Sequence, residues 1–300
     1  MYRIGIDLGG TNTAAGLVDE KGNIVDRESV KTNLPTTPER IVGDMIALCR
    51  KLMERNGLQN QDVCSVGVGV PCTANKETGC MEDADHLGFS SGPLTAPLRE
   101  ALGLPVYIEN DANAAAWGEY RAGQYEADSF LLVTLGTGIG GGIIQGGKLV
   151  TGVNNAAGEL GHMTICMDGE PCGCGLRGCF EVYGSASALI RQAREATGEP
   201  IAEAKEVFDR AAAGEQVFVR LLDTYTSYLA VGLSNLINIF GPAYICIGGG
   251  VSHAGGALLQ PVREKTYGRM FAKAANRKPQ IILARLHNDA GILGAAWLEE

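Results

Sequence analysis

Short apolar runs that end in glycine-rich turns open the chain and recur near its middle. Residues 2–31 follow the order YRIGIDL, GGTN, TAAGLVD, EKGN and IVDRESV, which reads as strands alternating with turns. Residues 129–150 repeat this plan as SFLLVTL, GTGIG, GGIIQ, GGK and LV. Chance can produce a single Gly-Thr turn, but two copies with a comparable strand plan favour an internal repeat. The repeat predicts two related halves with a cleft between them.

Helical and strand-like patterns alternate in the rest of the chain. A helix is expected over residues 38–56, because apolar residues recur there at helical spacing after a Thr36…Glu39 capping pattern. The other expected strands cover 63–70, 105–110 and 243–248, and the other expected helices cover 112–123, 186–197, 216–239 and 289–298. This alternation predicts an α/β fold.

The length of 300 residues exceeds the usual size of a single hydrophobic core, so two domains are expected. No low-complexity linker separates the halves, and the boundary is therefore placed from the repeat. The smaller N-terminal lobe is expected to comprise residues 1–111 plus 289–300. The larger C-terminal lobe is expected to comprise residues 112–288.

Composition narrows the classes of partner. Hydrophobic residues make up 45% of the chain and the formal net charge is −9, without a cluster of Lys and Arg, which argues against nucleic-acid binding. An anionic nucleotide would need Mg²⁺ and backbone N–H groups to offset this charge. No signal peptide or membrane-spanning run is visible. The chain has nine cysteines, and the crowding of three of them between 172 and 179 suits the reducing cytoplasm.

Both glycine turns of the repeat have the composition of phosphate-binding turns. In DLGGT (7–11) and LGTGIGGG (135–142), missing Cβ atoms let backbone N–H groups approach phosphate oxygens, and Thr11 and Thr137 add hydroxyl groups. Asp7, at a strand end, is suitably placed to hold Mg²⁺ through water. Each turn taken alone is explained equally well as a tight hairpin turn.

A dinucleotide-binding motif is a rival interpretation of the second turn. Gly136, Gly138 and Gly141 satisfy G-x-G-x-x-G, and the acidic Glu159 follows at roughly the 20-residue distance that the motif requires. That motif must open a helix, whereas the paired glycines and β-branched residues of GGIIQGGKLV predict a hairpin. The NAD interpretation is rejected on this context.

A carboxylate stands where an expected strand meets an expected helix, in IENDANAAAW (108–117). A helix N-terminus stabilises a carboxylate by about 0.3–1 kcal/mol, so Asp111 or Asn110 is explained as an N-cap alone. Asn110, Asp111 and Asn113 nevertheless crowd more polar groups together than one cap requires. A carboxylate in a cleft can accept the proton of an attacking hydroxyl. The residues alone leave both interpretations open.

Cysteine and histidine gather in GELGH (158–162) and CGCGLRGCFE (172–181). His162, Cys172, Cys174 and Cys179 offer one imidazole and three thiolates, the tetrahedral ligand set that Zn²⁺ prefers. Four protein ligands indicate a structural site, although a chance cluster of thiols in a surface loop is the alternative. Glu159 and Glu181 flank the cluster, and a bound metal would fix both carboxylates in space.

These motifs together resemble the ROK family of bacterial sugar kinases and repressors over nearly the whole chain, with the ROK glucokinases closest. The motifs are DLGGT, ENDANAAAWGEYR, LGTGIGGG, GELGH, CGCGLRGCFE and IGGGVS. The resemblance implies a two-lobed, actin-like (RNase H-like) ATPase fold with ATP and sugar in the interlobe cleft. It also implies a zinc-binding loop at 158–181.

The function that this resemblance implies is an ATP-dependent hexose kinase, a transferase of carbohydrate metabolism and glycolysis that acts on the 6-hydroxyl of glucose. The alternatives are an N-acetylmannosamine kinase or another ROK kinase for fructose, allose or mannose. The remaining alternative function is a sugar-sensing repressor. Repressors of the family carry an N-terminal helix-turn-helix, whereas this chain begins directly with the first expected strand. The resemblance further implies a homo-oligomer, either a dimer or a tetramer.

Carried over position by position, the resemblance makes Asp111 the catalytic base on the sugar hydroxyl. The sugar-contacting positions are Asn110, Asp111, Glu159, His162 and Glu181. The positions that bind ATP and its Mg²⁺ are Asp7, Gly9, Gly10, Thr11, Gly136, Thr137, Gly138, Gly248, Gly249 and Gly250. The ligands of the structural Zn²⁺ are His162, Cys172, Cys174 and Cys179. The chain departs from the family at His86 and Phe89 of the sugar-contact loop, where Phe89 replaces the usual Trp, and at Cys72 after Pro71, where Gly is frequent.

Overall fold

The computed structural model describes residues 1–271 and 278–299, and these residues form two compact units. The first unit comprises Met1–Glu126, Leu149–Gly158 and Leu286–Glu300, and the second comprises Ala127–Lys148 and Glu159–Arg285. The division differs from the expected lobe boundary at 111/112, because the helix that follows this boundary packs within the first unit.

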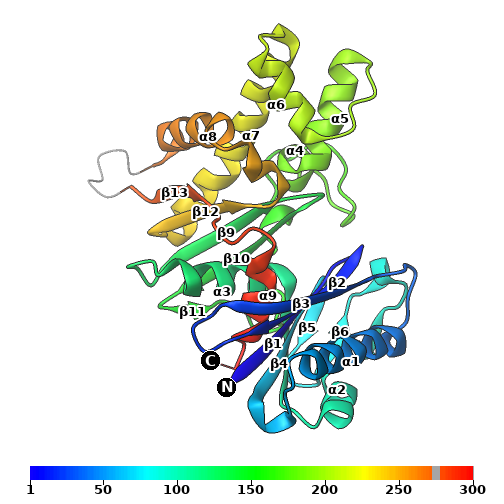
Figure 1. Cartoon of the computed structure of the whole chain (residues 1–300). Coiled ribbons are helices and arrows are strands. Elements are labelled where there is room, and N and C mark those ends of the chain that lie inside the picture. Colours follow the sequence, from blue (N-terminus) through cyan, green and yellow to red (C-terminus); the bar gives the residue numbers. More distant parts are fainter. Residues whose placement is uncertain (272–277, 300) are drawn as a thin grey trace. The chain divides into compact units, whose positions relative to one another are not determined.

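A five-stranded mixed sheet forms the framework of the first unit (Figure 1). Its strands are β1 (Tyr2–Leu8), β2 (Asn12–Val18), β3 (Ile24–Lys31), β4 (Val63–Val70) and β8 (Val106–Asn110), in the order β3-β2-β1-β4-β8. The first three pair antiparallel, whereas β4 and β8 run parallel to β1. A small sheet of β5 (Thr73–Asn75), β6 (Cys80–Glu82) and β7 (Ser91–Pro93) follows β4 along the chain.

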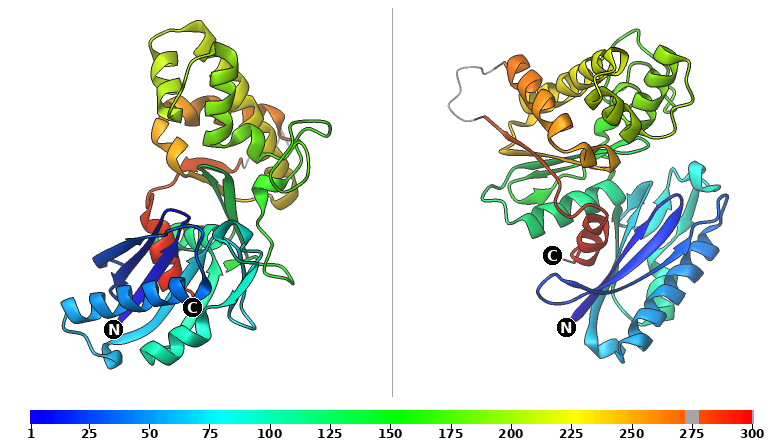
Figure 2. Two further views of the ribbon diagram at one scale, coloured as in Figure 1. Left: turned by 90° about the vertical axis from the view of Figure 1, so that its right-hand side faces the viewer. Right: turned by 45° about the horizontal axis from the view of Figure 1, so that its top comes forward.

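The two faces of the first sheet carry different helices because side chains alternate along each strand. Ile4, Ile6 and Leu8 of β1 are fully buried and belong to one core with α1 (Pro38–Arg55) and α2 (Thr95–Leu102). The intervening Gly5 faces α9 (Asp289–Ala296), where a Cβ would come within 1.9 Å of the Ile292 carbonyl oxygen. Figure 2 shows α1 and α9 on opposite sides of this sheet.

Helix α3 (Asp111–Gly123) packs against α9 at backbone distance. A Cβ on Gly118 would lie 2.2 Å from the Ala290 carbonyl oxygen, and one on Gly294 would lie 1.6 Å from that of Ala114. Small residues on both helices allow this approach, which explains the alanine and glycine content of both segments. The contact fixes the helix that begins at Asp111 on the first unit.

The second unit repeats the plan of the first sheet. Its strands are β9 (Phe130–Leu135), β10 (Ile139–Gln145), β11 (Lys148–Leu149), β12 (Tyr244–Gly248) and β13 (Gln280–Leu283), in the order β11-β10-β9-β12-β13. Again an antiparallel hairpin leads to two strands that run parallel to the first. The structure therefore confirms the internal repeat predicted from the glycine-turned hairpins.

The helices of the second unit all follow β11 in the sequence. They are α4 (Glu181–Gly184), α5 (Ala186–Thr197), α6 (Ala204–Ala212), α7 (Gln216–Phe240) and α8 (Gly256–Arg269). Single 3₁₀ turns occur at η1 (Asn60–Asp62), η2 (Asp85–Leu87), η3 (Leu160–His162) and η4 (Gly250–Ala254). Over the described ranges, no helix is long and apolar enough to cross a membrane.

Two local predictions can be compared with the backbone. The segment after Gly136 is a β-hairpin, in which Ile139 pairs with Leu135, so the rejection of a helix-opening dinucleotide motif is confirmed. The predicted Thr36 cap of α1 is wrong by one residue. Thr37 is the N-cap and accepts the Arg40 N–H at 3.4 Å, because Pro38 occupies the first helical position.

Candidate functional site

The carboxyl ends of three parallel strands meet at one edge of the first sheet. The register pairs Asp7 of β1 with Gly69 of β4, and Val70 of β4 with Asn110 of β8. Ligands of open α/β sheets bind beyond this edge. The predicted residues Asp7, Asn110 and Asp111 are therefore brought to the same edge of the first unit.

Asn110 and Asp111 divide the polar roles at the start of α3. Asn110 is the N-cap, and its Oδ1 accepts the N–H groups of Ala112 at 3.0 Å and Asn113 at 3.2 Å. Its Nδ2 donates to the Cys72 carbonyl at 3.4 Å and ties down the loop after Pro71. Asp111 is the first helical residue and is partly buried. The cap is thus a neutral amide, and the Asp111 carboxylate beside it shares one of the same donors, since its Oδ1 accepts the Ala112 N–H at 2.7 Å.

Asp7 lies against the first turn of α9, where a Cβ on Gly291 would be 2.8 Å from Asp7 Oδ2. Burial raises the pKa of Asp7 from 3.8 to about 6. Among the residues that the structure describes, no basic side chain forms an ion pair with it, so a hydrated divalent cation suits this carboxylate. The turn that follows is closed by the Gly9 N–H bonding to the Asn12 carbonyl at 2.9 Å, and Gly10 and Thr11 are exposed.

The β9–β10 turn of the second unit is shaped around Glu181. Glu181 Oε2 accepts the Ile139 N–H at 2.9 Å, and a Cβ on Gly138 would lie 2.2 Å from the same oxygen. Gly136 donates its N–H to the Gly138 carbonyl at 3.0 Å, while Thr137 is exposed. Two of the N–H groups around this turn are therefore already bonded, and Thr137 is its most accessible polar residue.

The predicted residues Glu159 and His162 approach the same turn. Glu159 precedes η3 and His162 is its last residue, and Gly161 between them packs so closely that a Cβ there would lie 2.2 Å from the Ile139 carbonyl oxygen. Glu159 is exposed and His162 is partly buried. The structure thus brings Glu181 and the η3 segment that carries Glu159 and His162 to Ile139 in the second unit, whereas Asn110 and Asp111 belong to the first.

The glycines of IGGGVS lie at the carboxyl end of β12, beside the end of β9. Gly248 pairs with Thr134, and Gly249 has φ of 77°. A Cβ on Gly249 would lie 2.5 Å from the Leu135 carbonyl oxygen, so both its backbone angle and its surroundings require glycine. Gly248, Gly249 and Gly250 are consequently brought next to the β9–β10 turn.

The four predicted metal ligands form one compact cluster. The ligand atoms of His162, Cys172, Cys174 and Cys179 all lie within 4.8 Å of one another. Cys174 Sγ is 3.6 Å from Cys179 Sγ, and Cys172 Sγ is 3.7 Å from His162 Nδ1. Tetrahedral zinc with bonds of about 2.3 Å to sulfur separates its ligands by comparable distances.

The electrostatics of this cluster also fit a cation. Burial, and after it the neighbouring thiols, raises the pKa of Cys179 to about 12. A thiolate at this position therefore needs a compensating positive charge, which a bound metal supplies. His162 faces the cluster through Nδ1, so its Nε2 lies on the other side of the imidazole ring.

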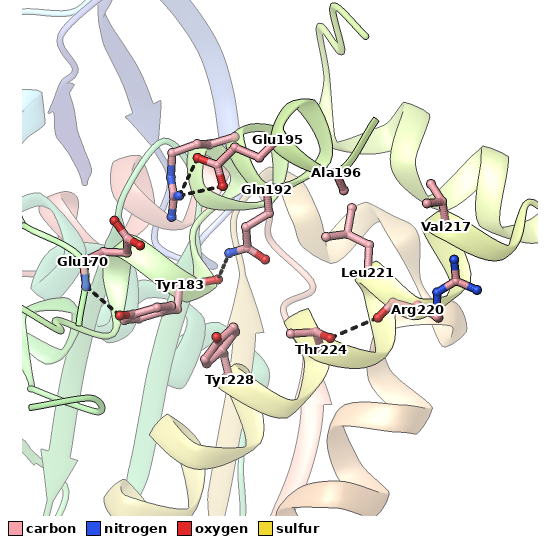
Figure 3. Close-up of a pocket in the computed structure, with 11 residues that line it drawn as sticks. Glu170, Tyr183, Gln192, Glu195, Ala196, Val217, Arg220, Leu221, Thr224 and Tyr228 are labelled. Atoms are coloured by element: carbon pink, nitrogen blue, oxygen red, sulfur yellow. Dashed lines mark hydrogen bonds and ion pairs between the residues drawn. The ribbon is translucent and has the colours of Figure 1, made fainter. Parts of the chain in front are cut away.

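Two pockets lie beside these residues in the second unit. One of about 310 Å³ is lined by Thr137 and Glu181 together with Ser185 at the start of α5. The second, of about 500 Å³, lies between α5, α7 and the segment around Glu170. Figure 3 shows Tyr183 and Tyr228 in its wall, and their ring centroids are 4.6 Å apart. None of the predicted site residues lines this second pocket.

Sequence reasoning missed one charged residue of the first unit, Glu109. Its side chain is fully buried and bonds to the backbone of Asn110. The available signal was an acidic residue at the end of an otherwise apolar strand, where an unpaired charge would be costly.

Comparison with known proteins extends over almost the whole chain. Residues 3–300 match the model of the ROK family. A glucokinase of Streptomyces coelicolor is 38% identical, and the alignment covers 98% of this chain and 96% of the relative. An N-acetylmannosamine kinase of Shigella boydii is 32% identical, and the alignment covers 100% of this chain and 99% of the relative. The solved structure of a ROK family glucokinase from Streptomyces griseus, in complex with glucose and AMPPNP, is 36% identical with a TM-score of 0.83, covering 99% of this chain and 98% of that one.

Proposed function

Because the chain belongs to the ROK family, we propose that it is an ATP-dependent hexose kinase that phosphorylates the 6-hydroxyl of glucose. The fold is that of the ROK sugar kinases, which are actin-like ATPases. Glucokinase relatives support the sugar, and the bound AMPPNP of the S. griseus enzyme supports ATP as the phosphoryl donor.

The observation that carries the proposal is the division of roles at the start of α3. Asn110 caps the helix, and the carboxylate of Asp111 follows it as the first helical residue at the ligand-binding edge of the sheet, where its Oδ1 accepts the Ala112 N–H at 2.7 Å. In the reaction, the sugar 6-oxygen forms a bond to the γ-phosphorus as the bond from that phosphorus to ADP breaks. Asp111 takes the proton of the attacking hydroxyl.

The remaining polar groups bind and orient the two substrates. Asn110, Glu159, His162 and Glu181 hold the hexose beside Asp111. Asn110 belongs to the first compact unit, and Glu159, His162 and Glu181 belong to the second. The phosphate side is assigned to Gly9, Gly10, Thr11, Gly136, Thr137 and Gly138, and the nucleoside side to Gly248, Gly249 and Gly250.

Two metal ions complete the proposal. Asp7 would hold Mg²⁺ through water, and this ion supplies positive charge for the phosphates. His162, Cys172, Cys174 and Cys179 would hold a structural Zn²⁺, which supplies no step of the reaction. The zinc loop ends at Glu181, two residues after Cys179, so an ordered loop fixes the direction of that carboxylate.

Asp111→Asn tests the proposal, because the amide keeps the shape of the side chain but cannot take up the proton. We expect glucose binding to persist while kcat falls by about 10²–10⁴-fold. Glu39→Gln, in the first turn of α1, removes an exposed helix-start carboxylate as a matched control and should retain wild-type kcat. Phosphorylation by Asp111→Asn at close to the wild-type rate would refute the base assignment.

N-acetylmannosamine is the second candidate sugar, favoured by the 32% identical relative. The loop after β6 bears on this choice, since His86 is exposed on η2 whereas Phe89 packs against the core of the first unit. Coupled assays with glucose, mannose, fructose, allose and N-acetylated hexosamines should give glucose the highest kcat/KM. A higher value for N-acetylmannosamine would assign the chain to that activity instead.

The proposal places the enzyme in the cytoplasm, as a dimer or tetramer without a nucleic-acid partner. Light scattering on the purified protein measures the oligomer directly. Specific retardation of operator DNA in a gel-shift assay would contradict the kinase-only role and favour a repressor.

A further inference from the structure

A fully buried carboxylate immediately precedes the Asn110–Asp111 pair. Glu109 is 0% exposed on β8. Its Oε1 accepts the backbone N–H of Asn110 at 2.9 Å and the side-chain N–H of Asn113 at 3.2 Å, while its Oε2 contacts the ammonium group of Lys76. One carboxylate therefore joins the end of a strand, the first turn of α3 and the turn between β5 and β6.

Stability alone does not account for this arrangement. A buried ion pair commonly stabilises a protein no better than well-packed apolar residues of the same size, because both charges lose their hydration. The network is also incompletely satisfied, since the buried Glu109 Oε2 and Asn113 Oδ1 accept no hydrogen bond among the described residues. The contact of Glu109 Oε2 with Lys76 is thus an ion pair without the geometry of a hydrogen bond. Buried polar groups that contribute little net stability are understandable where they fix a geometry.

The geometry in question is the junction between β8 and α3. Glu109 fixes the amide plane of Asn110 through its N–H, and it fixes Asn113 one turn along the helix. Asp111 lies between these two anchored residues. A displacement of about 1 Å of a reacting group can cost about 10²-fold in rate, so anchoring this junction matters to any chemistry at Asp111.

We propose that Glu109 and Lys76 act as a positioning pair that holds Asn110 and Asp111 in place for the sugar hydroxyl. The inference rests on the proposed kinase function and extends it to residues that do not themselves touch the substrate. Lys76 can be substituted without opening the core, because its side chain is 41% exposed. Its positive charge compensates that of the Glu109 carboxylate, which is fully buried.

Two single variants and their combination test the pair. Glu109→Gln keeps an oxygen that can accept both hydrogen bonds but removes the charge, and Lys76→Met removes the ammonium group but keeps the apolar stem. We expect each to lower kcat for the preferred hexose by roughly 10–100-fold while KM for ATP stays within about twofold of wild type. The double variant should recover at least fivefold relative to either single variant, because neither charge is then left unpaired.

The controls separate positioning from simple stability. Lys51→Met removes a surface lysine that pairs with Glu28 at 2.8 Å in the same unit, and its kcat should equal that of wild type. Urea unfolding of every variant shows whether it is folded under assay conditions. If Glu109→Gln does not fold, the exposed Lys76 variant still decides the question, since its side chain is not part of the core.

The outcomes are distinguishable from failure of the proposed function. If the wild type phosphorylates no hexose, the proposed function and the positioning pair are both refuted. If the wild type is active but folded Glu109→Gln and Lys76→Met keep wild-type kcat, only the positioning pair is refuted. Parallel losses in kcat and in KM for ATP would likewise refute it, because they indicate a general structural defect.

Discussion

The carboxylate of Glu181 occupies the space that a side chain on Gly138 would need. Glu181 Oε2 bonds to the Ile139 N–H at 2.9 Å, and the nearest distance to a Cβ built on Gly138 is 2.2 Å. The β9–β10 turn, which was predicted to bind phosphate, thus also contacts Glu181, a proposed sugar-binding residue. A substitution in this turn therefore tests the proposed phosphate-binding and sugar-binding groups together.

Gly138→Ala is expected to disturb the site more than the fold. The atom that the new methyl group meets is the end of a flexible side chain, so Glu181 can move away at modest cost. It then loses a charge-assisted hydrogen bond of about 1.5–3 kcal/mol, and kcat/KM for hexose should fall by roughly 10–100-fold. Gly268→Ala in α8, where a Cβ meets nothing within 4 Å, is the matched control. Unchanged kcat/KM in folded Gly138→Ala would contradict this role of Glu181.

Substitutions of Asn110 can separate its cap from its proposed contact with the sugar. Asn110→Ala removes the acceptor for two backbone N–H groups and should lower the free energy of unfolding by about 1 kcal/mol. Asn110→Ser keeps a capping oxygen and should stay within about 0.5 kcal/mol of wild type. Both lack the amide, so both should raise KM for hexose by roughly tenfold. A wild-type KM in Asn110→Ser would remove Asn110 from the sugar-binding set.

The raised pKa of Asp7 predicts a specific pH dependence of stability in metal-free buffer. The folded pKa of about 6 lies above the ordinary 3.8, so the folded protein keeps a proton that the unfolded chain releases in this range. The contribution of Asp7 is therefore most favourable below pH 4 and declines as pH rises through 6, by up to about 3 kcal/mol.

Urea unfolding of wild type and Asp7→Asn from pH 4 to 7 measures this effect. The advantage of the Asn variant over wild type should grow with pH, because only wild type must bury a charge. Added Mg²⁺ should reduce the difference above pH 6 if Asp7 holds the ion. A difference that stays flat across the range would show that Asp7 is not desolvated as described.

Loss of a cluster thiol should remove the metal. Cys174→Ser changes an exposed ligand, and we expect its affinity for Zn²⁺ to fall by more than the 10–100-fold typical of losing a group that only supports a ligand. Metal content by atomic absorption and thermal unfolding with and without chelator measure the effect. Cys166→Ser, an exposed cysteine of the same loop outside the cluster, should keep one metal per chain. The reverse pattern would mean that the ligand set is wrong.

Local patterns were sufficient for much of the fold. The glycine-turned hairpins, α1 and α7 have strong apolar periods, and their extents agree with the structure within a few residues. The strands β5, β6 and β7 were missed, since three residues are too few to show a period of two. Helix α8 was also missed, because Pro261 lies inside it and only a few of its residues are buried.

The same distinction applies to the candidate site: residues that are close in the sequence could be predicted, whereas contacts between distant segments could not. The four members of the Cys/His cluster were identifiable from residue type and close spacing, because a short loop can bring them together without the rest of the fold. Glu109 was not identifiable, since its burial and its contact with Lys76 depend on how β8 packs beside the β5–β6 turn.

The sequence by itself determined the repeated strand plan, the glycine turns and the clustering of His162 with three cysteines, because each depends on residues that are near neighbours along the chain. Only the tertiary structure decided that Asn110 rather than Asp111 caps α3 and that α3 packs on α9 in the first unit. It alone also decided that Glu181 closes over Gly138. These relationships depend on distances between segments far apart in the chain, which are set by packing and leave no period in the sequence.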